Sequence, residues 1–218
     1  GLTLLSAGAL MAAALAGPGA SPEAGPVVDH DYRLALGGYP TNTAKVFRWG
    51  LSAWEDEFRP EVRFDAKRWH SNLPDRVGRQ VGMLTLKAGP HTDLLWTTVT
   101  DHARSYGRWE ARVRTRVFNK GNAPFHVFFE LIPAGDYHCG AKNLAIASYY
   151  PGRPMVDGHI RTAPNNEYSF QVDPEATTEE YHTFAVEVTP NHISWFADKQ
   201  VLMTERRAGA LSGTKYKV

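Results

Sequence analysis

The stretch from Trp109 to Val117 alternates between side chains that suit a protein interior and side chains that suit water. Ala111 and Val113 fall on one side of an extended chain, and Glu110 and Arg112 fall on the other, because successive strand residues point to opposite faces. The pattern predicts a strand of a sheet with one buried face and one solvated face.

Other short runs of the same kind follow along the chain, each bounded by turn residues. They span residues 83–88, 125–132, 143–149, 168–172, 182–189 and 192–197. Pro190 and Asn191, between the last two runs, predict a hairpin turn. No run after the first residues has a helical period, so we expect an all-β sandwich or barrel. Its length suits one domain, which we place at residues 45–218.

The first residues form an apolar segment from Leu2 to Leu15, followed by Gly17 and Pro18. This is typical of the apolar region and cleavage site of a signal peptide, and it is too short to span a membrane as a mature helix. We therefore expect residues 1–16 to be a partial signal peptide, residues 17–44 to be a linker or N-terminal tail, and the protein to be secreted, extracellular or on the cell surface. A buried apolar helix is the alternative. The C-terminus is expected to be truncated, because another strand begins near Val218.

Charge and cysteine content limit the possible partners. The chain has 24 Lys and Arg against 23 Asp and Glu, a formal net charge of +1, so nothing favours nucleic acid or an anionic membrane. Cys139 is a single cysteine and forms no intrachain disulfide, so the exported fold must depend on its core. We expect a monomer without a cofactor.

Four separated pieces of sequence together resemble glycoside hydrolase family 16, the laminarinase and β-glucanase type. They are Trp-Glu-Asp-Glu-Phe at 54–58, Gly-Met-Leu-Thr-Leu-Lys-Ala at 82–88, Tyr-Gly-Arg-Trp-Glu-Ala-Arg-Val at 106–113, and the stretch 181–198. The resemblance covers roughly residues 50–218. It implies a concanavalin A-like jelly-roll β-sandwich of two antiparallel sheets, whose concave sheet binds a polysaccharide or cell-wall glycan. It also allows a structural calcium ion on the convex side.

The motif that carries the chemistry of that family is replaced. A retaining glycosidase needs two carboxyl groups about 5–5.5 Å apart. The family supplies them as Glu-x-Asp-x-x-Glu on one strand, where a bulge returns the last Glu to the face of the first. The resemblance places Asn143, Ala145 and Ser148 at these three positions, and no acidic residue lies between Gly140 and Tyr150. The retaining endo-glycanase reaction is therefore not expected.

Glu130 is the carboxylate that strand alternation places beside Asn143. One hypothesis makes Glu130 a relocated acid/base, with Asp136 or His138 as the second group. The other hypothesis is that Glu130 pairs with an arginine, such as Arg112 or Arg114, or binds sugar hydroxyls.

A set of polar and aromatic residues suits sugar binding, because pyranose rings need hydrogen-bond partners and ring faces. The set is Tyr106, His126, Glu130, His138, Asn143, Ser148 and Tyr149. His126, His138 and His159 lack the spacing of a strong metal motif. The sequence thus predicts a secreted carbohydrate-binding protein. An active glycosidase that uses Glu130, on a β-glucan or wall polysaccharide, and a purely structural surface protein are the alternatives.

Overall fold

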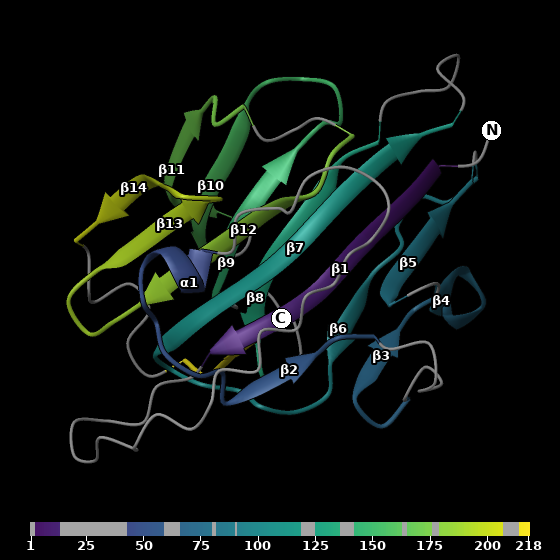
Figure 1. Ribbon diagram of the computed structural model, residues 1–218. Helices are drawn as coiled ribbons and strands as arrows, with labels where there is room; N and C mark the ends of the chain where they lie inside the picture. The colour runs from purple at the N-terminus through teal and green to yellow at the C-terminus, as the bar shows by residue number, and fades with distance from the viewer. Residues whose placement is uncertain are drawn as a thin grey trace.

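The computed structural model describes residues 3–13, 43–58, 66–79, 82–89, 91–118, 125–135, 142–162, 165–175, 179–206 and 214–218. Within these ranges strands predominate, and they form two layers in which β8 and β9 pass behind β7 (Figure 1). No helix in the described part is long and apolar enough to cross a membrane.

The front layer is an eight-stranded sheet. Its order is β14 (Gln200–Glu205), β13 (Ile193–Ala197), β12 (His182–Val188), β7 (Gly107–Val117), β1 (Thr3–Ala13), β5 (Met83–Ala88) and β4 (Val77–Arg79), with β2 (Trp54–Asp56) paired to β1. All of these pairings are antiparallel.

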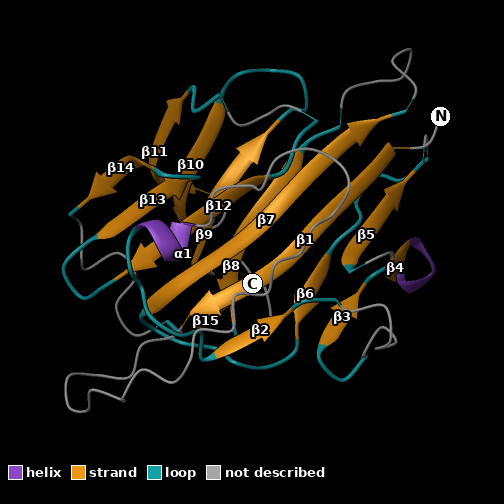
Figure 2. Ribbon diagram, viewed as in Figure 1, coloured by secondary structure: helices purple, strands orange, loops and turns teal. Residues whose placement is uncertain are grey.

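The rear layer is a five-stranded antiparallel sheet. Its order is β11 (Asn165–Val172), β10 (Val156–Thr162), β9 (Lys142–Tyr149), β8 (Val127–Pro133) and β15 (Tyr216–Lys217). A separate ribbon pairs β3 (Trp69–Ser71) with β6 (Thr97–Val99). The only helical elements described are α1 (Thr43–Val46) and a 3₁₀ turn at Pro74–Arg76 (Figure 2). The expected two-sheet antiparallel sandwich is confirmed.

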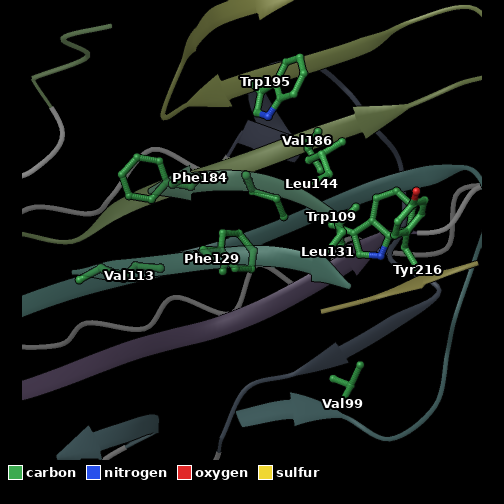
Figure 3. Packing of buried hydrophobic residues seen from close by; sticks show 14 of the residues in the cluster. Val99, Trp109, Val113, Phe129, Leu131, Leu144, Phe184, Val186, Trp195 and Tyr216 are labelled. Atoms are coloured by element: carbon green, nitrogen blue, oxygen red, sulfur yellow. The ribbon is translucent and has the colours of Figure 1, made fainter. Parts of the chain in front are cut away.

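The core fills the space between the layers. Phe184 and Trp195 from the eight-stranded sheet are fully buried against the same cluster as Leu131 and Leu144 from the five-stranded sheet (Figure 3). Burying each side chain of this size contributes about 1.5–3 kcal/mol, so the shared cluster holds the sheets together without a disulfide. Because successive side chains of a strand point to opposite faces, the residues that alternate with the core residues lie on the two outer surfaces.

The front sheet bears on two expectations. The segment predicted as part of a signal peptide contains β1, which lies between β5 and β7; its cleavage stays a prediction. The polar side of β7 was expected to be wet, but Glu110 is buried there, because the carboxylate accepts a hydrogen bond from the Ala44 N–H of α1 at 2.7 Å. Most of the predicted linker lies outside the described residues.

The predicted hairpin is confirmed, since β12 and β13 pair antiparallel on either side of Pro190 and Asn191. Besides β1, several strands were not predicted, namely β2, β3, β4, β6, β10 and β14. The apolar side of β10 consists of Val156, Gly158 and Ile160, and the glycine interrupts the apolar alternation that predicts a strand. Glycine is needed there, because a Cβ at Gly158 would lie 2.3 Å from Cε1 of Phe170.

Candidate functional site

The outer face of β9 forms the centre of the site, and a bulge decides which side chains reach it. Phe129 of β8 pairs with Ala147, but the next residue, Glu130, pairs with Ala145. Ile146 therefore has no partner on β8 and is the additional residue of the bulge. Trp195 donates an indole N–H to the Ala145 carbonyl at 2.8 Å within the core. Because of the bulge, Ile146 and Ala147 both face the core, and the residue after them faces outward again.

This bulge brings the three positions of the replaced motif onto one face. Asn143 and Ala145 are two residues apart on a regular strand, and Ser148 returns to their side after the bulge. All three are buried, with exposed fractions of 0%, 0% and 3%. No carboxylate stands at any of them, so β9 itself supplies no acid or nucleophile of the glycosidase type.

A carboxylate nevertheless reaches this face from the neighbouring strand. Glu130 on β8 and His159 on β10 are both register partners of Ala145. Because the alanine side chain is small, they meet across β9, with Glu130 Oε1 at 3.5 Å from His159 Nε2 and 3.3 Å from Asn143 Nδ2, which donates to it. Asn143 Oδ1 and His159 Nε2 have no hydrogen-bond partner among the described residues, so both side chains could form a further hydrogen bond.

A second polar contact lies on the same face, toward the end of β9. Ser148 Oγ lies 2.9 Å from His126 Nε2, and the tautomer of His126 decides which atom donates. The imidazole stacks on the Tyr150 ring, with 4.3 Å between ring centres, and lies against the Phe128 ring, with 4.0 Å between ring centres. Burial lowers the pKa of His126, although the charges of Asp157 and Glu130 act in the opposite direction. A neutral imidazole bound to a hydroxyl is therefore the dominant form near neutral pH.

Strand β10 adds polar groups that sequence reasoning did not assign to the site. Asp157 is the register partner of Ser148, and Arg161 is the register partner of Asn143. Gln171 of β11 donates its amide to Asp157 at 2.7 Å. The alternation of Asp157, His159 and Arg161 with apolar residues was present in the sequence, and it would have placed all three on one face.

Not every predicted site residue is found on this face. Tyr149 was expected at the site but is buried in the core beside Phe184, because the bulge turns it inward, and burial raises its pKa to about 12. Tyr106 is half-exposed just before β7, and its part in sugar binding stays a prediction. Asp136 and His138 lie outside the described residues.

The arginine row of β7 does not belong to this site. Trp109 and Val113 of β7 face the core, so Arg112 and Arg114 lie on the opposite surface, where both guanidinium groups contact the Tyr181 ring. The hypothesis that either arginine pairs with Glu130 is therefore wrong.

No group of three His, Cys, Asp or Glu side chains in the described ranges is arranged to hold a metal ion. The calcium ion that the resemblance allows stays a prediction.

Comparison with known proteins adds a finding at the level of the fold. No protein-family model matches the chain, and no curated protein matches it. Solved structures do match, among them a laminarinase from Flavobacterium sp. UMI-01, with a TM-score of 0.60 and 16% identity over 76% of this chain and 85% of that one. The laminarinase catalytic domain from Thermotoga maritima MSB8 matches with a TM-score of 0.58 and 12% identity, over 76% of this chain and 84% of that one.

A family 16 endo-glucanase from Bacteroides ovatus, solved in complex with G4G3G-2F-DNP, gives a TM-score of 0.57 and 14% identity over 74% of this chain and 82% of that one. Two antiparallel sheets with a polar outer face thus define a concanavalin A-like jelly roll. More particularly, the chain has the jelly-roll fold of the family 16 laminarinases and glucanases, at an identity so low that the likeness establishes the fold alone.

Proposed function

We propose that this protein is a secreted, monomeric carbohydrate-binding protein that recognises a β-glucan or wall polysaccharide and lacks the retaining endo-glycanase reaction. The observation that carries the proposal is the absence of a carboxylate at Asn143, Ala145 and Ser148, although the bulge still turns these positions to one face. A retaining reaction needs two carboxyl groups about 5–5.5 Å apart, one of which forms the glycosyl ester. An amide, a methyl group and a hydroxyl hydrogen-bonded to a histidine do not perform either role.

The groups that remain suit recognition of sugar hydroxyls. Glu130 and Asp157 present carboxylate acceptors, and Gln171 presents an amide, all on the same outer face. Phe128 is 49% exposed and lies against His126, so an apolar ring is also available. Sugar recognition combines such polar partners with ring faces, and it does not require a reacting carboxylate pair.

Affinity electrophoresis in gels that contain laminarin, mixed-linkage β-glucan or galactan tests binding. Retardation of the wild-type protein on at least one polysaccharide is expected, together with no new reducing ends after long incubation. Glu130→Gln tests the site, because it removes the charge and keeps the shape, and Glu205→Gln at the end of β14 is the matched control. A protein that no polysaccharide retards would exclude the binding function and leave a structural role.

An active glycosidase is the second candidate, and the position of Asp157 favours it. Asp157 and Glu130 lie on the two strands that flank β9, opposite Ser148 and Ala145, so their carboxylates share one face without being direct neighbours. An inverting enzyme uses two separated carboxyl groups, about 6.5–9.5 Å apart, of which one activates a water and the other protonates the leaving group. Reducing ends that Glu130→Gln abolishes, with inversion at the anomeric carbon in NMR spectra of the products, would replace the binding proposal by this one.

A further inference from the structure

Trp96 differs from every other tryptophan of this protein. The other five, Trp49, Trp54, Trp69, Trp109 and Trp195, have exposed fractions of 9% or less, whereas Trp96 is 36% exposed. Leu94 and Leu73 beside it are also exposed, at 63% and 39%. Burial of so large an apolar ring is strongly favourable, so an exposed tryptophan within an apolar patch is typical of a binding surface.

The backbone around this ring is held rigidly. Asn72 accepts a hydrogen bond from the Trp96 N–H through Oδ1 and donates one to the Leu94 carbonyl through Nδ2, both at 2.9 Å. Ser71 Oγ donates to the Trp96 carbonyl at 2.7 Å. The indole ring lies against His70 with 5.3 Å between ring centres. A surface ordered before binding loses little conformational entropy on binding, which favours affinity.

This aromatic platform, formed by Trp96 and His70, lies on the same side of the protein as Glu130. In the β3–β6 ribbon, Trp69 and Val99 are paired and face the core, so the alternate residues face outward. The ribbon lies beside the five-stranded sheet, because the Val218 carbonyl, just after β15, accepts hydrogen bonds from Val99 N–H at 2.8 Å and Thr98 Oγ1 at 2.6 Å. Since β15 pairs with β8, the outer face that carries Glu130 continues onto the platform.

We infer that the platform is an additional sugar-binding subsite for the glycan chain that the Glu130 face binds. The inference rests on the proposed function and adds to it a contact with a neutral pyranose ring. The exposed indole face offers an apolar surface for the C–H groups of the ring, and the His70 imidazole offers hydrogen bonds to its hydroxyls. Because the platform and Glu130 lie on different strands of one continuous face, the ligand is a chain of several sugars rather than a single sugar.

Affinity electrophoresis on laminarin and mixed-linkage β-glucan tests this subsite through Trp96→Ala. Truncation of an anchoring tryptophan weakens binding by about tenfold or more. Trp96→Tyr keeps an aromatic face and is expected to restore most of the retardation. Phe118→Ala is the matched control, because Phe118 is an exposed aromatic residue that follows β7 of the other sheet.

Fluorescence provides a second measurement on the unaltered protein. Because the other five tryptophans are buried, quenching by acrylamide reports mainly on Trp96. Laminarin that retards the protein is expected to protect this emission from quenching. Retardation equal in wild-type and Trp96→Ala protein, without protection, would overturn the subsite and leave the proposed function intact. Absence of wild-type retardation on every polysaccharide would overturn both.

Discussion

Replacement of Trp195 by phenylalanine tests whether the core controls the bulge in β9. The indole N–H is the buried group that donates to the Ala145 carbonyl, and the side chain of Trp195 has no exposed surface. Phenylalanine keeps an aromatic ring but leaves this carbonyl without its donor. An unsatisfied buried acceptor costs about 1–3 kcal/mol.

The smaller ring adds a packing loss of about 1 kcal/mol, so Trp195→Phe is expected to lower the free energy of unfolding by about 2–4 kcal/mol. For a domain of this size the melting temperature should then fall by roughly 4–16 °C. Urea denaturation followed by circular dichroism measures the free energy directly, with the slope of the transition compared between variants.

Trp54→Phe is the matched control. Trp54 is also buried, but its indole N–H has no hydrogen-bond partner among the described residues, so only the packing loss of about 1 kcal/mol is expected. The difference between the two variants isolates the hydrogen bond to the bulge. Equal losses of stability in Trp195→Phe and Trp54→Phe would refute the claim that this bond stabilises the bulge.

Three further predictions concern the core, the outer surface and the site. Gly158→Ala should lower the free energy of unfolding by about 1–3 kcal/mol in urea denaturation, because its Cβ would overlap a ring of β11, whereas Gly78→Ala has open space and should be nearly neutral. Burial raises the pKa of Glu110 from 4.5 to about 7, so the folded state binds more protons between these pH values and stability falls as the pH rises through this window. Glu110→Gln should flatten that pH dependence in thermal melts, and an unchanged slope would contradict it. Tyr150→Ala exposes the His126 ring and should raise its pKa in an NMR titration, since burial is the main cause of its lowered value.

Proteins that share this jelly roll carry their chemistry on a few side chains of one face, and the fold does not require those side chains. Asn143, Ala145 and Ser148 face away from the cluster that joins the two sheets, so their identities determine neither the strand pattern nor that core. The fold can therefore stay the same while the residues on its outer face change.

The all-β sandwich could be predicted from the amino-acid sequence, because the alternation in Trp109–Val117 is local and depends only on the two-residue period of a strand. The absence of a carboxylate at Asn143, Ala145 and Ser148 also follows from residue identity alone. The surroundings of these three residues depend on how the strands pair in three dimensions. The pairing of Glu130 with His159 joins β8 to β10 across the third strand between them, and such a contact depends on register. The bulge in β9 likewise turns Tyr149 into the core. Packing against Phe170 requires a glycine at position 158, and this glycine interrupts the strand pattern of β10. Both constraints come from residues on neighbouring strands, so the local sequence does not reveal them.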